Sequence, residues 1–300
     1  MKNKNNNFIT IKDIIRYIVT IFYSNDITSF HINNNIYDEV IHIISFILNL
    51  PINNLENFID SKILNIELSK ILDIVNYRIK MRIPFSYIIN KSYICNHDIY
   101  VDRNVILPRS LIAELIKNDL NIISKNPWKN KNLLDMCTGS GYLSILLAKH
   151  FPNSQIYASD ISLKALNIAK KNIHKYFLQD RIILYKSNLF NSLPKILYDI
   201  IICNPPYIDM KHINKLPLEF KYEPLISLNG GCNGMKLIRI ILNKANNFLS
   251  NNGVIIIEIG NKIMEFEKSF PNIHPKWLET ENTNDKVIMI YKNQINSIKN

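Results

Sequence analysis

The chain has 300 residues, of which 47% are hydrophobic and 20% are charged, and this balance excludes an intrinsically disordered protein. Only 7 residues are glycine, which excludes a collagen and a flexible linker. The net charge of +11 is uneven, because residues 1–105 hold 11 basic and 10 acidic residues while the remainder holds 25 and 15, so we expect any attraction to RNA or an acidic partner on the C-terminal two thirds.

The N-terminal part has the pattern of a small helical domain. Residues 1–7 form a polar tail without the apolar core of a secretory signal. Residues 8–23 carry Ile and Phe at helical spacing, and two more helices are predicted over 37–50 and 55–77. The uncharged stretch at 41–55 is too short and too broken to span a membrane. We predict an N-terminal substrate-recognition domain over residues 1–83.

Residues 84–105 are predicted to form a linking β-hairpin, with β-like segments at 87–89 and 99–101. A helix is predicted over 111–123. From residue 132 onward strands and helices alternate, which indicates right-handed βαβ units and a mainly parallel sheet. The last two strands have no helix between them, so one of them is expected to be antiparallel. The predicted strands are 133–137, 155–159, 181–186, 198–203, 253–259, 277–280 and 287–291, and the predicted helices are 142–150, 163–176, 235–249 and 262–270.

The cysteines are scattered and form no C-x-x-C pair, so we expect reduced thiols in a cytoplasmic protein. No two cysteines or histidines have the spacing of zinc ligands, and we predict no metal site. The four cysteines are Cys95, Cys137, Cys203 and Cys232.

A strand followed by a glycine-containing turn is predicted over residues 133–141, Leu-Leu-Asp-Met-Cys-Thr-Gly-Ser-Gly. Gly139 and Gly141 let the backbone turn sharply and approach a ligand more closely than a Cβ would permit. Asp160 ends the next predicted strand, where its carboxylate can accept hydrogen bonds from both hydroxyls of a ribose. The pattern favours a nucleoside site, although a tight turn followed by a helix capped by Asp160 would use the same residues.

The missing third glycine distinguishes between nucleoside ligands. A dinucleotide fingerprint has that glycine where this chain has Ser144, and the chain has no phosphate-binding P-loop. A nucleoside without pyrophosphate fits better, and S-adenosylmethionine is such a ligand.

A second motif, Asn204-Pro205-Pro206-Tyr207, follows the apolar strand at 198–203. Ligands of open parallel sheets bind at the carboxyl ends of strands, where both motifs fall. The prolines remove two N–H donors, which leaves the Asn204 side-chain carbonyl and the Pro205 backbone carbonyl as acceptors for both hydrogens of a substrate –NH2. Tyr207 offers a flat apolar face to a planar group. In the alternative interpretation, the two prolines only end a strand.

This pair of acceptors suits methylation of a planar nitrogen, which is a poor nucleophile because its lone pair is delocalised. Holding both N–H bonds aims the remaining lobe at a sulfonium methyl and stabilises the positive charge that develops. Positioning of this kind contributes on the order of 7–11 kcal/mol. No general base is evident in the motif, so we expect the proton to leave after the transfer.

Two other loops are candidates to line the site. After the third strand, Asn188 is placed to hydrogen-bond an adenine edge and Leu189 to pack on its face, unless this is a solvated loop. Residues 258–261 are interpreted as a turn that either is purely structural or lines the pocket.

With these motifs the chain resembles the HemK-like family of protein-glutamine methyltransferases over nearly its whole length. It is most similar to the branch that acts on large-subunit ribosomal protein number three. The resemblance is carried by residues 107–114 (Leu-Pro-Arg-Ser-Leu-Ile-Ala-Glu), 137–141 (Cys-Thr-Gly-Ser-Gly), 219–224 (Glu-Phe-Lys-Tyr-Glu-Pro) and 258–262 (Glu-Ile-Gly-Asn-Lys). One departure is Asn188, where an Asp is usual, and we expect weaker cofactor binding from it at most.

The resemblance implies an α/β fold with a seven-stranded Rossmann-like class I methyltransferase domain over 106–300. It also implies S-adenosylmethionine as cofactor, ribose binding by Asp160 and glutamine binding by Asn204–Tyr207. We assign catalysis to Asn204, Pro205 and Tyr207, and substrate binding to these residues and Pro206. The residues assigned to the cofactor are Asp135, Thr138, Gly139, Ser140, Gly141, Asp160, Asn188, Leu189 and Asn204.

Three alternatives remain beside a ribosomal substrate. The first is methylation of a glutamine in peptide chain release factors. The second is DNA adenine methylation, which needs a basic target-reading surface that the nearly neutral residues 1–105 do not offer. The third is a non-catalytic ribosome-assembly module, against which the intact Gly139, Gly141, Asp160 and Asn204 argue. We expect a cytoplasmic enzyme that methylates a ribosomal protein, with a basic catalytic domain that tolerates or exploits nearby ribosomal RNA.

Overall fold

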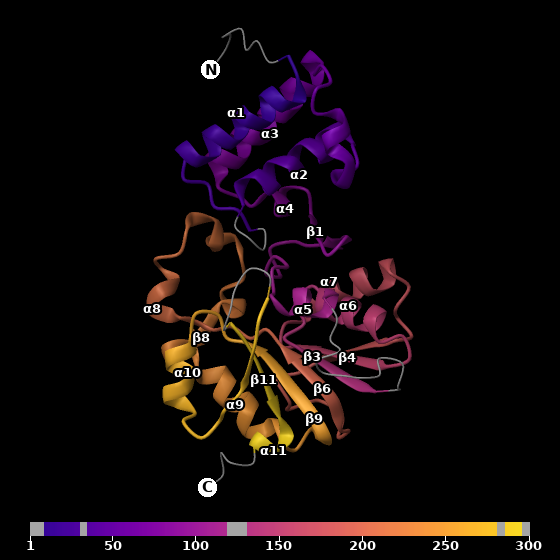
Figure 1. Ribbon diagram of the computed structural model, residues 1–300, viewed down its shortest axis with the longest axis vertical. Helices are drawn as coiled ribbons and strands as arrows, with labels where there is room; N and C mark the ends of the chain where they lie inside the picture. The colour runs from indigo at the N-terminus through magenta and orange to yellow at the C-terminus, as the bar shows by residue number, and fades with distance from the viewer. Residues whose placement is uncertain (1–8, 31–34, 119–130, 281–285, 296–300) are drawn as a thin grey trace. The chain divides into compact units, whose positions relative to one another are not determined.

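The computed structural model describes residues 9–30, 35–118, 131–280 and 286–295. The chain divides into two compact units, and the N-terminal stretch of the first is drawn in indigo and purple in Figure 1. The first unit comprises Met1–Ile89 together with Pro217–Tyr222, and the second comprises Asn90–Leu216 and Glu223–Asn300. A short segment from far along the chain therefore belongs to the N-terminal unit.

Helices α1 (Ile11–Ser24), α2 (Ile36–Leu48) and α3 (Asn65–Met81) build the first unit. A capping box begins α1, in which Thr10 Oγ1 accepts from the Asp13 backbone N–H at 3.3 Å and the Asp13 carboxylate accepts from the Thr10 backbone N–H at 3.0 Å. The apolar stripe predicted for this helix is buried, and the helices expected over 8–23 and 37–50 are confirmed. The stripe consists of Ile11, Ile14, Ile15, Ile18 and Phe22.

The helix predicted over residues 55–77 is wrong in its first part. The chain forms a 3₁₀ helix over Ile52–Phe58, and α3 begins only at Asn65. Between the two, the backbone carbonyl of Ser61 accepts a hydrogen bond at 3.1 Å from the backbone N–H of Ile11. The pairing with the start of α1 replaces helical hydrogen bonds here, and the spacing of apolar residues does not reveal a partner so far away in sequence.

A buried cluster of charges holds the segment that contains Glu219 in the first unit. Arg78 is fully buried, and its Nε lies 2.8 Å from Glu39 while one Nη lies 3.3 Å from Glu219. Its other Nη donates to the Thr28 carbonyl at 2.8 Å. Glu219 is also fully buried and lies 2.9 Å from the Arg82 guanidinium. Removing one partner from such a pair costs roughly 3–5 kcal/mol, so this cluster fixes the segment firmly.

The linker region differs from the prediction in its first half. Phe85–Ile88 is a short helix, α4, and not part of a strand at 87–89. The hairpin consists of β1 (Lys91–Ile94) and β2 (His97–Tyr100), which are antiparallel and belong to the second unit. Both turn residues, 95 and 96, have positive φ, as a two-residue hairpin turn requires. Three apolar residues are too short a run to distinguish a strand from a helical turn.

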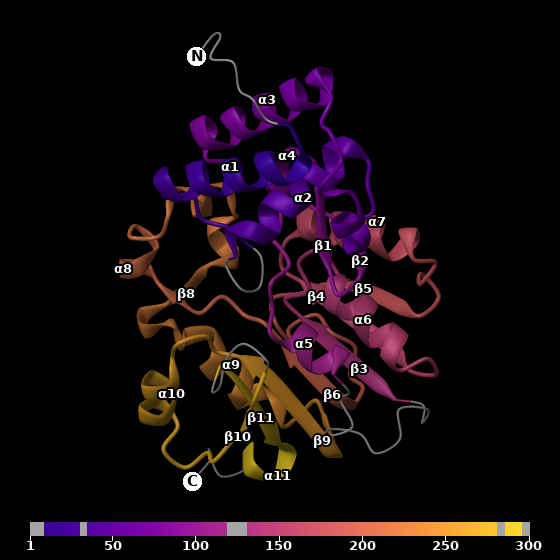
Figure 2. The same ribbon diagram turned by 45° about the horizontal axis from the view of Figure 1, so that its top comes forward.

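A seven-stranded sheet forms the centre of the second unit, with the order β10-β11-β9-β6-β3-β4-β5 (Figure 2). All neighbours are parallel except β11, which is antiparallel to both β9 and β10. The predicted parallel sheet with an antiparallel strand at its end is confirmed. The strands are β3 (Asn132–Met136), β4 (Gln155–Asp160), β5 (Ile182–Lys186), β6 (Tyr198–Cys203), β9 (Leu249–Glu258), β10 (Lys276–Leu278) and β11 (Val287–Tyr291).

The helices of this unit also follow the prediction closely. The helix predicted over 142–150 has these bounds, and that over 235–249 ends early because β9 has already begun at Leu249. The described part of the helix expected over 111–123 ends at residue 117, and residues 119–123 lie outside the described part. The helices are α5 (Ile112–Lys117), α6 (Tyr142–His150), α7 (Leu163–Lys175), α9 (Lys236–Ala245), α10 (Ile263–Ser269) and α11 (Lys292–Ile295).

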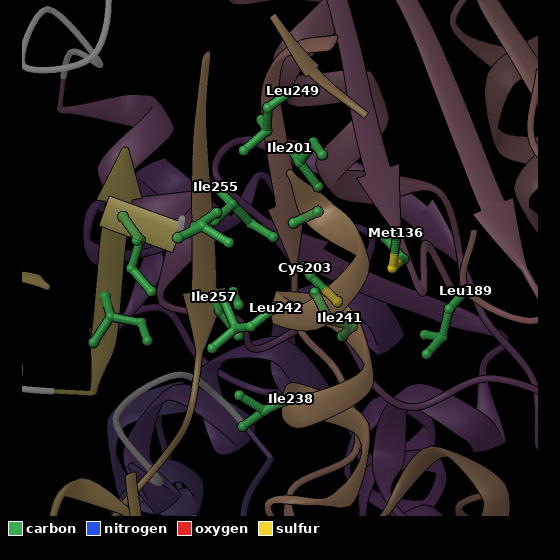
Figure 3. Packing of buried hydrophobic residues seen from close by; sticks show 14 of the residues in the cluster. Met136, Leu189, Ile201, Cys203, Ile238, Ile241, Leu242, Leu249, Ile255 and Ile257 are labelled. Atoms are coloured by element: carbon green, nitrogen blue, oxygen red, sulfur yellow. The ribbon is translucent and has the colours of Figure 1, made fainter. Parts of the chain in front are cut away.

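Apolar packing holds the central strands in place. Ile238, Ile241 and Leu242 of α9 pack in one cluster with Ile255 and Ile257 of β9, and all five are fully buried (Figure 3). Burial of one such side chain contributes about 1.5–3 kcal/mol. The strand ends that carry the two motifs therefore project from a well-packed sheet.

A small sheet that was not predicted from the sequence follows the second motif. Strand β7 (Ile208–Asp209) is parallel to β8 (Asn229–Gly231). Between them lie the short helices α8 (Met210–Ile213), η3 (Leu218–Tyr222) and η4 (Leu225–Ser227). Strands of two or three residues are too short to show a period, which explains why they were missed.

Candidate active site

The carboxyl ends of neighbouring strands bring the two motifs together. Strands β3 and β6 are parallel, and Met136 lies opposite Cys203 in their register. The glycine-containing loop 137–141 and the loop 204–207 begin immediately after these two residues. Neighbouring strands are about 4.8 Å apart, so the two loops start side by side. Strand β4, on the other side of β3, ends in Asp160.

The glycines of the first loop have two different roles. Both have positive φ, +57° at Gly139 and +80° at Gly141. A Cβ on Gly141 would come within 3.0 Å of the Ala169 Cβ, so this glycine allows α7 to pack closely. A Cβ on Gly139 would meet nothing within 4 Å. The open space beside the Gly139 backbone is where a ligand can approach closely.

The Asp160 carboxylate is tied to the first loop. One oxygen accepts from the Gly139 backbone N–H at 3.0 Å, and the other accepts from the Ser162 backbone N–H at 2.8 Å. Burial raises the pKa of Asp160, and these hydrogen bonds partly offset that rise. Each oxygen keeps a lone pair for a ribose hydroxyl. Ser162 caps α7 by accepting from the backbone N–H of Ala165, so Asp160 is not the cap.

Asp135 lies fully buried near the end of β3, below the loop. Its Oδ2 accepts from the hydroxyls of Thr138, at 2.6 Å, and Ser144, at 2.5 Å. No described residue hydrogen-bonds its Oδ1. Burial raises the pKa of Asp135 to about 6. Ser144, at the position of the absent third glycine, therefore helps to hold the loop from inside.

Asn172, a residue of α7 that sequence reasoning missed, connects the loop to the hairpin. Its side-chain amide donates to the Ser140 carbonyl at 2.8 Å and to the Tyr100 carbonyl at 2.9 Å. Its Oδ1 accepts from the Tyr100 backbone N–H at 2.7 Å. Asn172 is fully buried on the apolar face of a helix, and this unusual placement was the signal available in the sequence.

Asn204 is half-buried at the end of β6, and no described residue hydrogen-bonds its side-chain amide. Pro205, the next residue, is buried. Within residues 9–30, 35–118, 131–280 and 286–295, the Asn204 amide thus has no hydrogen-bond partner, and it lies beside the glycine-containing loop. An acceptor in this position is available to a ligand.

Tyr207 is held by a hydrogen-bond network from distant parts of the chain. Its hydroxyl donates to Glu258 Oε1 at 3.2 Å. The other Glu258 oxygen accepts from Ser110 Oγ at 2.6 Å and from the Leu111 backbone N–H at 2.9 Å. Burial raises the pKa of Glu258, while burial and the nearby Glu258 carboxylate raise the pKa of Tyr207. The phenol therefore stays protonated and remains a donor.

Three glycines make room for the same tyrosine. A Cβ on Gly230 would lie 2.6 Å from the Tyr207 Cα, and one on Gly234 would clash with its carbonyl oxygen. A Cβ on Gly260 would lie 2.5 Å from the tyrosine ring. We call Gly230, Gly234 and Gly260 the glycine cradle. Three of the 7 glycines of the chain thus serve one residue of the second motif.

Arg109 and Glu223 form a second brace. Both terminal nitrogens of the Arg109 guanidinium pair with the Glu223 carboxylate, one of them at 2.7 Å, in a bidentate arrangement. Glu223 also accepts from the Leu107 backbone N–H at 3.0 Å. The brace ties the segment that follows the second motif to the residues beside Ser110.

The loop after β5 contains two candidate cofactor-binding residues, one exposed and one buried. Asn188 is exposed, whereas Leu189 is 8% exposed and belongs to the core cluster, although it has a positive φ of 52° (Figure 3). Ser187 Oγ donates to the Leu189 carbonyl at 2.6 Å. The loop thus combines a core leucine with an asparagine that is open to a ligand or to solvent.

Sequence reasoning found both loops but missed the residues that hold the second one. It noted Arg109, Ser110 and Glu223 only as marks of a family, and it placed Glu258 only in a turn that is either structural or lines the pocket. One usable signal was the scarcity of glycine, since at six of the 7 glycines a Cβ would lie 3.0 Å or less from another atom.

Comparison with known proteins confirms the predicted resemblance. Residues 114–218 match the model of the methyltransferase small domain family. The chain is 39% identical to the ribosomal protein uL3 glutamine methyltransferase of Bordetella pertussis, over 99% of this chain and 100% of that protein. It is 37% identical to the protein of the same name from Neisseria gonorrhoeae, over 95% of each chain. A crystal structure of a methyltransferase from Pyrococcus furiosus is 16% identical, covers 72% of this chain and 98% of its own, and has a TM-score of 0.47. The chain belongs to the family of ribosomal protein uL3 glutamine methyltransferases.

Proposed function

We propose that this member of the family transfers one methyl group from S-adenosylmethionine to a glutamine side-chain amide of ribosomal protein uL3. The observation that carries the proposal is the Asn204 amide at the end of β6, which no residue of the described part of the chain hydrogen-bonds. It adjoins a loop that has open space at Gly139. A nitrogen nucleophile and a nucleoside cofactor then meet at the carboxyl edge of one sheet.

The first loop and Asp160 suit the cofactor. The sulfonium group of S-adenosylmethionine supplies an electrophilic methyl when bound. The Gly139 backbone allows close approach, and the Asp160 oxygens have lone pairs left for the ribose hydroxyls. Thr138, Ser140 and Gly141 complete the loop. Asn188 serves the adenine edge, with Leu189 below it, and Asp135 holds the loop from inside.

The second loop positions the glutamine. The Asn204 side-chain oxygen and the Pro205 carbonyl accept hydrogen bonds from its two N–H groups. This directs the nitrogen lone pair at the methyl group and stabilises the positive charge that develops on nitrogen. Tyr207 lies against the amide plane, and Pro206 keeps the loop stiff. We assign Glu258 as a positioning residue, because it acts on the substrate only through the Tyr207 hydroxyl.

The substrate protein binds through the first unit in this proposal. Apolar side chains are exposed on and beside α3, among them Leu64 at 60% and Ile66 at 65%. We place the reaction in the cytoplasm, with ribosomal RNA close to the substrate. No helix in the described part of the chain is long and apolar enough to cross a membrane.

Mass spectrometry tests the substrate. The chain is produced in a host that lacks its own glutamine methyltransferases, and ribosomal proteins and release factors are compared with and without it. We expect uL3 to gain the mass of one methylene group at a glutamine, and a gain confined to release factors would contradict the proposal.

The Asn204→Ala variant tests the site. Loss of one preorganised hydrogen-bonding group should lower kcat by roughly 100- to 1,000-fold, while calorimetry finds cofactor affinity roughly intact because the other cofactor residues remain. Asp160→Ala should do the reverse and weaken cofactor binding first. The control is Asn167→Ala, an exposed residue of α7, which should behave as the parent. If Asn204→Ala retains full turnover, the assignment of the second loop is wrong.

A further inference from the structure

A basic and aromatic surface lies on the second unit outside the candidate active site. It is formed by the hairpin β1–β2, the end of α6 and the C-terminal half of α7, which Figure 2 shows next to one another. We call it the basic–aromatic surface. It comprises Lys91, His97, Tyr100, Lys149, Lys171, Lys175, Tyr176 and Phe177.

The lysines of this surface are ordered by aromatic rings. The Lys149 Nζ lies 4.6 Å from the centroid of the Tyr176 ring, and the Lys175 Nζ lies 5.7 Å from the same ring. Lys171 lies 4.5 Å from the Tyr100 ring centroid. These contacts hold the ammonium groups in place, so a polyanion that binds them loses less side-chain entropy than with free lysines.

Positive charge exceeds negative charge here. Asp98 pairs with Lys91 at 3.0 Å and lies 4.0 Å from Lys175, so its carboxylate faces two of the four lysines of this surface. The Lys149 Nζ lies 2.6 Å from His97 Nε2, and burial lowers the pKa of His97. A neutral imidazole accepts this hydrogen bond and leaves the lysine charged. Burial also lowers the pKa of Lys149 and of Lys175, as expected of partly dehydrated cations that an arriving anion stabilises.

Phe177 is the feature that the fold does not explain. It follows the end of α7 with a φ of 56°, where glycine or asparagine is usual, and it is 85% exposed. The left-handed backbone costs a non-glycine residue about 1–2 kcal/mol, and the exposed ring gains no burial in return. An aromatic ring presented to solvent beside ordered lysines has the form of a stacking platform for nucleobases.

We propose that the basic–aromatic surface binds single-stranded RNA, with the lysines on phosphates and Phe177 stacked on a base. Single strands are favoured over a duplex because only unstacked bases expose a face to the ring. This inference deepens the proposed function, since a ribosomal substrate brings RNA with it. The test of RNA binding does not measure methyl transfer, so its failure would not contradict the proposed methyltransferase activity.

Fluorescence anisotropy with the full chain and a labelled oligouridylate of about twelve nucleotides tests the proposal. Phe177→Asn removes the ring at a position where asparagine tolerates the backbone, so it should not lower the thermal midpoint. We expect it to weaken RNA binding by roughly 5- to 150-fold, from a stacking contribution of about 1–3 kcal/mol. Combining Lys149→Gln, Lys171→Gln and Lys175→Gln should reduce the slope of log affinity against log salt by about 2.

Matched controls lie elsewhere on the second unit. Met264 is 80% exposed on α10, and Lys276 is exposed on β10, so Met264→Asn and Lys276→Gln should leave RNA binding unchanged. Binding of a polyglutamate peptide, measured in the same way, distinguishes an RNA ligand from an acidic protein partner. Three outcomes overturn the proposal: no RNA binding at low salt, an RNA affinity that the surface variants do not change, or tighter binding of polyglutamate than of RNA.

Discussion

The two loops at the carboxyl edge of the sheet are built in opposite ways. The loop 137–141 makes its own shape from positive φ angles at Cys137, Gly139 and Gly141. The loop 204–207 contains prolines in place of glycines and depends on a cradle and a hydrogen-bond network from residues far away in sequence. The first loop is therefore evident in a short stretch of sequence, whereas the second is held by the tertiary structure.

This difference suits the tasks that we propose for them. A cofactor has one shape, and a loop that fits it can be encoded in a few adjacent residues. An amide nitrogen is a poor nucleophile, so the two acceptors that orient it must be positioned to within a fraction of an ångström. Such precision requires surrounding residues that hold the acceptors in place. Substitutions in the two loops and in their supports test how far each loop depends on its own residues.

Paired glycine substitutions should give the largest effect. In Gly260→Ala the new Cβ would come 2.5 Å from the Tyr207 ring at a φ of +57°, so we expect a loss of about 2–5 kcal/mol in the free energy of unfolding. Gly139→Ala has the same φ but open space, so only the backbone cost of about 1–2 kcal/mol should appear. Urea unfolding measures both.

The same two variants should differ in function. Gly139→Ala places a methyl group in the space assigned to the cofactor, so calorimetry should find weaker cofactor binding at modest loss of stability. Gly260→Ala should lower turnover by moving Tyr207. Equal destabilisation by the two substitutions would show that the cradle is not needed and would remove the contrast between the loops.

The pH dependence of stability tests Asp135, a buried titratable support of the first loop. The pKa of Asp135 rises from 3.8 to about 6 on folding, so the native state binds this proton more tightly than the unfolded state. Its contribution is therefore most favourable at acid pH, and the free energy of unfolding falls by up to about 3 kcal/mol as pH rises through this range.

The Asp135→Asn variant isolates this contribution. An amide does not titrate, so the difference in unfolding free energy between parent and variant should change between pH 3.8 and about 6 and be constant above that range. Urea unfolding at a series of pH values measures the difference. A constant difference over the whole range would mean that Asp135 keeps an ordinary pKa.

The smallest effect is expected from the network behind Tyr207. Tyr207→Phe removes and Glu258→Gln weakens the hydrogen bond between these two side chains, and each should lower kcat by about tenfold without changing cofactor affinity. Because both act through the same bond, the double variant should be little worse than either single one. Additive losses in this double-mutant cycle would mean that Glu258 does not act through Tyr207.

Sequence reasoning predicted most of the sheet domain and both loops. Strand 198–203 and helix 142–150 were correct to the residue, because long runs with one period leave little choice. It failed at residues 55–64 and 85–88, where a pairing with α1 or a short apolar run decides the conformation.

By itself, the sequence determined the alternation of strands and helices, the two motifs and the family, because these are encoded in neighbouring residues. Only the tertiary structure decided which residues hold Tyr207, and that the segment with Glu219 belongs to the first unit while Glu223 belongs to the second. The physical reason is that a buried carboxylate needs a partner, and no local pattern tells which arginine or hydroxyl from a distant part of the chain will supply it.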